Sequence, residues 1–378
     1  MGESGERRFL IVAGEASGDA HAARLLTALG SLGPCCARGV AGPALLAAGT
    51  GRVVPMEDLA VLGFSGVVAR LPRIWSAYRR LLAAARTFRP HAALLVDSPG
   101  FNFRLGPALR RLGVPVFYYI APQVWAWHPE RAAQMARWVE RLAVIFPFEE
   151  ALFRDAGVHA RFVGHPLLEG LEPEVDGAVF RAEIGAAPGT PILGLLPGSR
   201  PQELRAHAPV MAGAALRLRA SRPGLAVVLA LAPGLEREAR RLRSALDGVR
   251  VVTGRTRAVQ AHATCCAVAS GTASLETALF GTPEVIVYRT GWLNYEIARR
   301  MVTLARIGLP NIVAGEEVVP ELLQGDLSVE HLAATLAPWL DDPGARELQR
   351  ARLAAVRARL GGPGAARRAA EWLWEMVA

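Results

Sequence analysis

The sequence predicts an α/β protein with two doubly wound parallel sheets and a helical C-terminal tail. Its 378 residues are enough for two domains of ordinary size. Hydrophobic residues make up 52% of the chain and charged residues 20%, so two buried cores can form. Short apolar runs alternate with amphipathic stretches along most of the chain, which is typical of parallel strands joined by helices.

The first half contains four apolar runs that predict buried strands. These runs are Phe9–Ala13, Ala92–Val96, Val114–Ile120 and Leu142–Phe146. Helical periodicity is present between them at His21–Leu32, Trp75–Thr87 and Glu130–Arg141. We therefore expect a Rossmann-like domain over residues 1–170.

A domain boundary is predicted between Gly164 and Pro191, where prolines and glycines interrupt the pattern. The alternation then resumes, and we expect a second Rossmann-like domain over residues 190–350, with a ligand in the cleft between the two. Its predicted strands are Ile192–Leu196, Ala226–Leu231, Val249–Val252, Cys265–Ala269 and Val285–Tyr288. Residues 351–378 form the helical tail. The tail could pack on the first domain or on a partner subunit, so a homodimer stays open.

The charge of the chain limits the classes of partner. All 43 basic residues are arginines, and the formal net charge is +9. An excess of positive charge predicts phosphorylated substrates or anionic lipid, while the scattered arrangement of the arginines argues against nucleic acid. Without lysine the chain has neither a Schiff-base residue nor a P-loop lysine.

Cysteine and histidine spacing gives no indication of a metal site or another cofactor. The four cysteines form two adjacent pairs, Cys35-Cys36 and Cys265-Cys266, and are expected to be free thiols in a reducing compartment. No uninterrupted apolar stretch reaches the ~18 residues of a membrane span. We therefore expect a cytoplasmic protein.

Two loops of the first domain follow predicted strands, where parallel sheets bind ligands. The first is Gly14–Asp19, in which Gly14 and Gly18 permit close backbone approach and Ser17 or Asp19 could cap a helix. A plain glycine turn is the alternative. The second loop begins with Asp97, which is placed to act as a general base or, alternatively, as a turn residue.

Two loops of the second domain also follow predicted strands. Arg200 ends the first loop and could clamp a phosphate. The second loop opens a helix with Ser270, Gly271 and Thr272, whose free N–H groups would suit a diphosphate. Glu276 lies further along that helix and could accept hydrogen bonds from a ribose diol. Simple helix capping is the alternative in both loops.

Several motifs, taken in order, resemble those of the lipid-A-disaccharide synthases. They span residues 10–325 of the chain. They are Gly14–Asp19, Val40–Pro43, Asp97–Asn102, Ala121–Trp127, Phe146–Glu149, Phe162–Pro166, Leu196–Arg200, Ala269–Glu276 and Leu309–Ile312. Departures from the family pattern are Pro201-Gln202 after Arg200, and Thr290–Asn294 in place of a more basic stretch.

The resemblance implies a GT-B glycosyltransferase that inverts configuration without a metal or other cofactor. Its donor would be UDP-2,3-diacylglucosamine, and its acceptor 2,3-diacylglucosamine 1-phosphate (lipid X). The acceptor 6-hydroxyl would attack the anomeric carbon, giving a β-1,6-linked disaccharide and UDP. Another UDP-sugar enzyme of this fold, an N-acetylglucosaminyltransferase or a 2-epimerase, is the alternative.

The resemblance also implies roles for individual residues. Asp97 would be the base. Donor contacts would come from Arg200, Ser270, Gly271, Thr272, Glu276, Asn311 and Gln324. The first-domain loop, with Gly14, Glu15, Ser17 and Gly18, would close over the reaction centre.

Residues 61–89 combine apolar side chains with arginines, as in a membrane-surface helix. Packing on the sheet is the alternative. Because the implied substrates carry acyl chains, we expect peripheral contact with the cytoplasmic face of the inner membrane. The expected contact residues are Val67, Val68, Leu71, Ile74 and Trp75.

Overall fold

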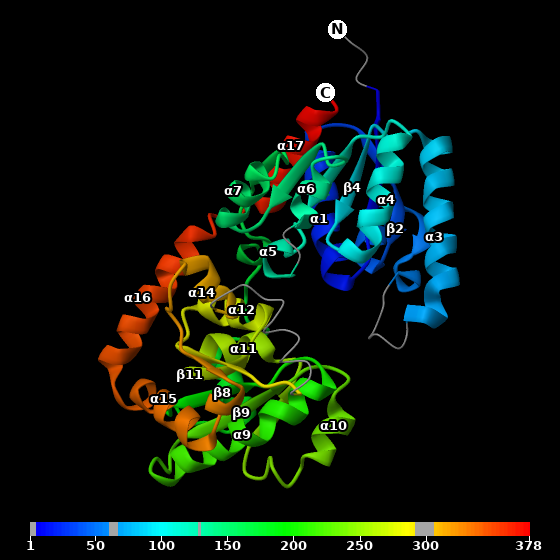
Figure 1. Cartoon of the computed structure of the whole chain (residues 1–378). Helices are drawn as coiled ribbons and strands as arrows, with labels where there is room; N and C mark the ends of the chain where they lie inside the picture. Colours follow the sequence, from blue (N-terminus) through cyan, green and yellow to red (C-terminus); the bar gives the residue numbers. More distant parts are fainter. Residues whose placement is uncertain (1–4, 60–66, 128–129, 292–305) are drawn as a thin grey trace. The chain divides into compact units, whose positions relative to one another are not determined.

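The computed structural model describes residues 5–59, 67–127, 130–291 and 306–378. The chain divides into two compact units: unit 1 comprises Met1–Glu169 and Gly361–Ala378, and unit 2 comprises Gly170–Leu360. Each unit is a parallel sheet with helices packed on it (Figure 1). The predicted class, two doubly wound α/β domains with a helical C-terminal segment, is confirmed.

The sheet of unit 1 has seven strands in the order β3-β2-β1-β4-β5-β6-β7. All neighbouring strands are parallel. The strands are β1 (Arg7–Ala13), β2 (Cys35–Ala41), β3 (Gly51–Pro55), β4 (Ala92–Val96), β5 (Val116–Tyr119), β6 (Arg141–Val144) and β7 (Ala160–Phe162). The four central strands that were predicted are present, and β2, β3 and β7 extend the sheet on either side.

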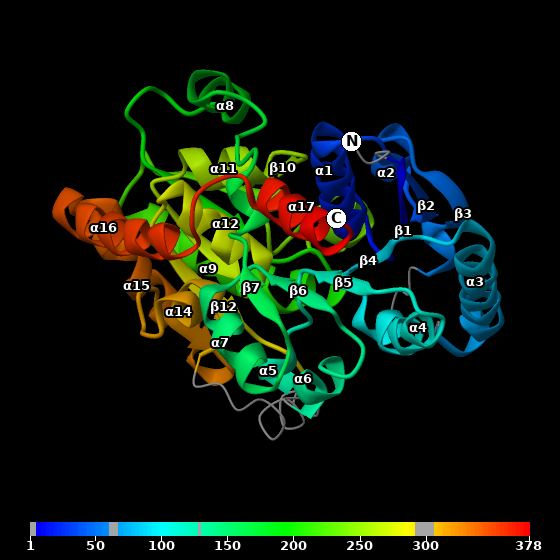
Figure 2. The same ribbon diagram turned by 90° about the horizontal axis from the view of Figure 1, so that it is seen from above.

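Helices cover unit 1 on both faces of its sheet, including one from the C-terminus of the chain (Figure 2). They are α1 (Ala16–Leu32), α2 (Pro43–Ala47), α3 (Val67–Phe88), α4 (Pro99–Arg111), α5 (Val124–Trp127), α6 (Glu130–Met135), α7 (Pro147–Asp155) and α17 (Ala365–Met376). Helix α17 packs along α1, and its Trp372 ring lies 5.6 Å from the Phe117 ring. The tail expected over residues 351–378 is therefore split between the two units: the end of α16 (Pro343–Arg359) belongs to unit 2, and α17 belongs to unit 1.

The sheet of unit 2 has six strands in the order β10-β9-β8-β11-β12-β13. They are β8 (Ile192–Leu196), β9 (Ala226–Leu231), β10 (Arg250–Thr253), β11 (Cys265–Ala269), β12 (Glu284–Tyr288) and β13 (Glu321–Leu323). The helices besides α16 are α8 (Gly177–Ile184), α9 (Pro201–Ala220), α10 (Glu236–Arg241), α11 (Thr256–His262), α12 (Thr272–Phe280), α14 (Leu309–Ala314) and α15 (Val329–Asp341).

Strand order reverses once in each sheet. In unit 1 the reversal lies between β1 and β4, and in unit 2 between β8 and β11. At such a point the loops leave adjacent strands in opposite directions and open a crevice beyond the carboxyl ends of the strands. All four loops singled out in the sequence follow one of these four strands, so the topology gathers them in two pairs.

Candidate active site

The loop after β4 in unit 1 holds Asp97 in an unusual backbone conformation. Asp97 and Ser98 both have positive φ, at 47° and 46°, and Ile120 at the neighbouring tip of β5 has φ 65°. Non-glycine residues rarely adopt this region, and it is an outlier for a β-branched residue. Strain of this kind persists only where surrounding contacts enforce it, and it is found at functional sites.

The contacts that hold Asp97 act on its backbone. Its carbonyl oxygen accepts hydrogen bonds from Asn102 Nδ2 at 2.7 Å and from the Tyr118 hydroxyl at 2.5 Å. Its amide donates to the Tyr119 carbonyl at 3.2 Å. The main chain is therefore fixed by three partners, while the carboxylate stays available for chemistry.

The surroundings of Asp97 raise the pKa of its carboxyl group. Burial raises its pKa, the negative charge of Glu15 raises it further, and the hydrogen-bonding Ser98 amide opposes both. A higher pKa makes a carboxylate a stronger base, so this environment suits proton abstraction.

The Gly14–Asp19 loop lies against Asp97. The Gly14 amide donates to Ser98 Oγ at 3.1 Å, and a Cβ on Gly14 would come within 2.4 Å of that oxygen. Gly14 is therefore needed for close approach, whereas a Cβ on Gly18 would meet only ordinary contacts. Glu15 and Ser17 are exposed at the start of α1.

Helix capping in this loop differs from the sequence expectation. Glu15 is the N-cap of α1 and no side chain caps that helix. Asp19 is instead buried and accepts from the Gly42 and Ala44 amides at 2.8 Å each, so it holds the start of α2. The expectation that Ser17 or Asp19 caps α1 is wrong, because neither side chain bonds the first turn.

In unit 2, α12 presents an open helix start. Gly271 is its N-cap with φ 147°, a conformation that glycine adopts readily, and no side chain caps the helix. Ser270 Oγ donates to the Ile307 carbonyl at 3.1 Å and so fixes the loop. Thr272 is exposed at the first helical position. Uncapped N–H groups and the positive end of the helix dipole make this start suitable for a phosphate.

The amides at the start of α9 are bonded by a carboxylate of the same helix, that of Glu203. One oxygen of Glu203 accepts from the Ser199 and Arg200 amides at 2.9 and 3.1 Å, and the other from Arg200 Nη1 at 2.9 Å. The Ser199 and Arg200 amides are thus already bonded within the chain. The Arg200 side chain is nevertheless 79% exposed, so its remaining nitrogens can reach a ligand.

Glu276 lies on α12 beside Arg257 of α11. Arg257 Nη2 is 3.5 Å from a Glu276 oxygen, and Arg257 Nη1 donates to the Gly170 carbonyl at 3.1 Å. Burial raises the pKa of Glu276, while Arg257 and Gln260 oppose that shift. These two neighbours favour the ionised carboxylate that a ribose diol would require.

Asn311 and Gln324 play different parts in unit 2. Asn311 is fully buried; its Nδ2 donates to Val319 and Glu321, and its Oδ1 accepts two backbone amides. Its side chain therefore supports the following loop. Gln324 follows β13 with φ 50°, and its Nε2 is buried without a hydrogen-bond partner among the described atoms.

Two of the residues expected to contact the membrane, Leu71 and Trp75, lie at the surface of α3, whereas Ala77, Leu81 and Ala85 of the same helix pack in the core of unit 1. The side chains of Leu71 and Trp75 are 46% and 61% exposed, Ile74 is half-buried, and the Trp75 ring stacks on Tyr78 at 5.3 Å. The side chains of Val67 and Val68 lie outside the described part of the structure. Exposed aromatic and aliphatic side chains on one helix are typical of an interaction surface.

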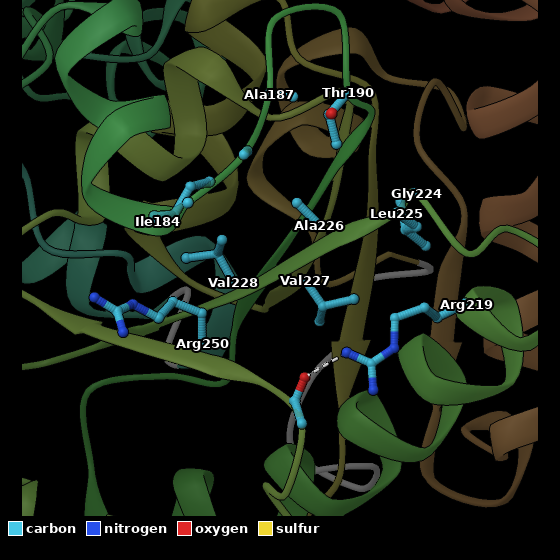
Figure 3. Close-up of a pocket in the computed structure, with 13 residues that line it drawn as sticks. Ile184, Ala187, Thr190, Arg219, Gly224, Leu225, Ala226, Val227, Val228 and Arg250 are labelled. Atoms are coloured by element: carbon cyan, nitrogen blue, oxygen red, sulfur yellow. Dashed lines mark hydrogen bonds between the residues drawn. The ribbon is translucent and has the colours of Figure 1, made fainter.

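A pocket of about 370 Å³ lies elsewhere on unit 2 (Figure 3). It is lined at the amino ends of β9 and β10, the opposite edge of the sheet from α12. Its two arginines already donate to backbone carbonyls, Arg219 to Gly248 and Arg250 to Glu183. None of the candidate residues lines it, so it carries no part of the proposed chemistry.

Within residues 5–59, 67–127, 130–291 and 306–378, His, Cys, Asp and Glu nowhere gather as three or more potential metal ligands. None of the helices in those same ranges combines the length and apolarity needed to cross a bilayer.

Comparison with known proteins relates the whole chain to one family. A family model described as lipid-A-disaccharide synthetase matches residues 9–368. The lipid-A-disaccharide synthase of Anaeromyxobacter sp. (strain K) is 46% identical over 368 residues, which cover 96% of each chain.

Among solved structures, the UDP-GlcNAc 2-epimerase from Neisseria meningitidis aligns with a TM-score of 0.67 at 12% identity, covering 97% of this chain and 100% of its own. The glycotransferase of kitacinnamycin aligns with a TM-score of 0.62 at 16% identity, covering 99% and 100%. At such low identity these likenesses concern the fold alone, and that fold is the GT-B plan.

Proposed function

The chain belongs to the lipid-A-disaccharide synthase family, and we propose that it joins two acylated glucosamine units. The donor is UDP-2,3-diacylglucosamine and the acceptor is 2,3-diacylglucosamine 1-phosphate. The acceptor 6-hydroxyl forms a bond to the donor anomeric carbon as the bond from that carbon to UDP breaks, which inverts the configuration. The observation that carries this proposal is the family match over residues 9–368. Within the separate units, the base-like carboxylate of Asp97 and the uncapped start of α12 supply groups that such a transfer needs.

Asp97 is the proposed base that takes the proton of the acceptor hydroxyl. Three hydrogen bonds fix its main chain, and the Ser98 amide bonds its carboxylate. Burial and the neighbouring Glu15 raise its pKa, which increases its basicity. Gly14 brings the flanking loop into hydrogen-bond contact with Ser98, so this loop lies beside the proposed base.

The leaving UDP is proposed to bind at the start of α12. The amides around Gly271 and Thr272 and the helix dipole would stabilise the charge that develops on the diphosphate. The exposed guanidinium of Arg200 would add a second contact. Removal of one such donor is expected to cost about 2.7–4 kcal/mol in the transition state.

Glu276 and Gln324 are proposed to contact the rest of the donor. Arg257 and Gln260 favour ionised Glu276, which could accept hydrogen bonds from both ribose hydroxyls. Gln324 Nε2 has no hydrogen-bond partner among the described residues and could donate to the nucleotide. Asn311, in this proposal, positions the neighbouring loop and does not touch the donor.

We propose that the transfer needs no metal. Fixed cationic and amide groups in unit 2 could balance the charge of UDP, as described above for α12 and Arg200. Activity should therefore survive an excess of chelator. Its loss, with recovery on adding a divalent cation, would contradict this part of the proposal.

Membrane contact is proposed for α3, at the cytoplasmic face of the inner membrane. Burying a large apolar side chain contributes about 1.5–3 kcal/mol. Replacing Leu71 and Trp75 with serine should therefore sharply reduce sedimentation with anionic vesicles. Leu348→Ser is the matched control, because Leu348 of α16 is 60% exposed on the other unit. Equal losses in both variants would exclude a specific role for α3.

The decisive assay measures UDP release with each acylated sugar alone and with both together. Release that requires both supports the synthase. Turnover of unacylated UDP-N-acetylglucosamine would instead favour another UDP-sugar enzyme of the same fold. Sedimentation of the purified chain would decide between a monomer and the homodimer left open above.

A further inference from the structure

His207 is a fully buried residue of α9 with both ring nitrogens engaged. Nδ1 lies 2.8 Å from the Pro197 carbonyl oxygen, and Nε2 accepts a hydrogen bond from the Arg289 amide at 2.9 Å. A backbone N–H can only donate, so Nε2 carries no proton. The single proton of the neutral ring is therefore on Nδ1, where it is donated to Pro197.

These two contacts join separate loops at the carboxyl edge of the sheet in unit 2. Pro197 follows β8 directly and opens the loop that ends at Arg200. Arg289 follows β12 directly. His207 thus connects the tips of two strands that are not neighbours, because β11 lies between β8 and β12.

The connection continues from Arg289 to the tip of β13. The Arg289 guanidinium donates to the Gln324 carbonyl at 3.3 and 3.1 Å and also to the Leu327 carbonyl. The Thr290 amide lies 3.4 Å from Gln324 Oε1. A continuous path of hydrogen bonds therefore runs from the Arg200 loop through His207 and Arg289 to Gln324.

We propose that His207 is a positioning residue of the nucleotide site, a neutral Nδ1–H imidazole that sets the spacing between the Arg200 loop and Gln324. This inference rests on the proposed function, which places UDP in unit 2. Burial lowers the pKa of His207 and outweighs the hydrogen bonds to Pro197 and Arg289 and the charge of Glu203, which raise it, so the ring is neutral. Without the ring, a buried N–H and a buried carbonyl would lose their partners and both loops would shift.

The test compares UDP affinity in three proteins at neutral pH. His207→Leu removes both hydrogen bonds and should weaken UDP binding about tenfold or more, since each unpaired buried group costs on the order of 1–3 kcal/mol. His207→Gln offers one donor and one acceptor and should stay within about threefold of the wild type. When donor concentration is varied, kcat of both variants should change less than the KM for the donor.

His262→Gln is the matched control, because His262 is a partly buried histidine of unit 2 that contacts one carbonyl, that of Val175. Its UDP affinity should equal that of the wild type. If His207→Leu binds UDP as tightly as the control does, the inference is overturned. If the wild type itself binds no UDP, the proposed function fails instead, so the two failures are distinguishable.

A second measurement does not depend on any variant. Nitrogen-15 chemical shifts of the His207 ring distinguish a protonated nitrogen from an unprotonated one. We expect Nδ1 to be protonated and Nε2 unprotonated at neutral pH, with and without UDP. A proton on Nε2 would contradict the hydrogen bond to Arg289 and overturn the inference.

Discussion

Replacing Asp97 with asparagine is the sharpest test of the catalytic assignment. Positioned general bases contribute about 10²–10⁴-fold to rate, which corresponds to about 2.7–5.5 kcal/mol of barrier. An amide of the same shape cannot take the proton of the acceptor hydroxyl. We therefore expect kcat to fall by that factor while UDP affinity stays unchanged, because the change lies in unit 1.

Asparagine is preferable to alanine for a structural reason. Asp97 has φ 47°, and asparagine and aspartate tolerate this region better than other non-glycine residues. Alanine would add about 1–2 kcal/mol of backbone strain there. Asn102 and Tyr118 bond the main-chain carbonyl of residue 97, so both contacts persist in Asp97→Asn.

Thermal stability gives an independent test of the raised pKa of Asp97. The folded protein raises the pKa of Asp97, so ionisation of this side chain opposes folding above the unfolded pKa. Asp97→Asn removes that cost and should unfold at an equal or higher temperature at pH 8. The difference should disappear in acid, where the aspartate is protonated in both states.

The assay is UDP release at saturating donor and acceptor, with thermal unfolding measured on the same samples. A kcat of Asp97→Asn within a few-fold of the wild type would refute the assignment of the base. If Asp97→Asn unfolded at a lower temperature than the wild type at pH 8, the claim that the folded protein raises the pKa of Asp97 would be refuted.

Three further variants test the surrounding network. Glu15→Gln removes the charge that helps to raise the pKa of Asp97, so the acid limb of the pH–rate profile should move to lower pH; an unmoved limb would contradict the coupling. Arg257→Gln removes the main group opposing the raised pKa of Glu276, so donor KM should rise, and rise more as the pH falls; a pH-independent KM would exclude this link. Glu203→Ala deletes the acceptor at the start of α9 and should lower the free energy of unfolding by about 1 kcal/mol in urea titrations; unchanged stability would show that the cap contributes nothing.

Strand positions could be predicted from the sequence where the strands are central and apolar. Ala92–Val96, Ile192–Leu196, Ala226–Leu231 and Cys265–Ala269 were predicted with the bounds that β4, β8, β9 and β11 have. Strands β3 and β13 were not predicted; both lie at sheet edges, and β13 has only three residues. Edge strands are buried less completely, so they need no continuous apolar run and leave a weaker signal.

Helix ends were less predictable than strands. The helix expected over Glu130–Arg141 stops at Met135, since Arg141 already begins β6 and the chain must turn back to the sheet. Helical periodicity continues past such a turn, because the apolar side chains of Trp138 and Val139 still face the core. Periodicity therefore reports burial and does not locate the end of a helix.

The sequence predicted which loops at the ends of strands form the candidate site. It could not predict the backbone conformation or the burial of the residues in those loops. The sequence predicted that both loops of unit 1 follow parallel strands, β1 and β4, and so lie at one edge of the sheet, while the observed strand order makes them neighbours. The left-handed backbone of Asp97 depends on Asn102 and Tyr118, and the burial of Asn311 depends on the loop after it. Such contacts join residues whose spacing carries no local signal.

The two helix starts of unit 2 show where a local signal was present and informative. Arg200 and Glu203 have the three-residue spacing of a capping box, in which the carboxylate bonds backward to the amides at the start of the helix. At the corresponding point α12 has Ser274, whose hydroxyl donates to the Gly271 carbonyl and leaves the first amides without a side-chain acceptor. One start is thus closed by its own anion and the other is open to an external one. That difference, three residues beyond each glycine-containing turn, is why we place the UDP diphosphate on α12 and assign Arg200 a side-chain contact only.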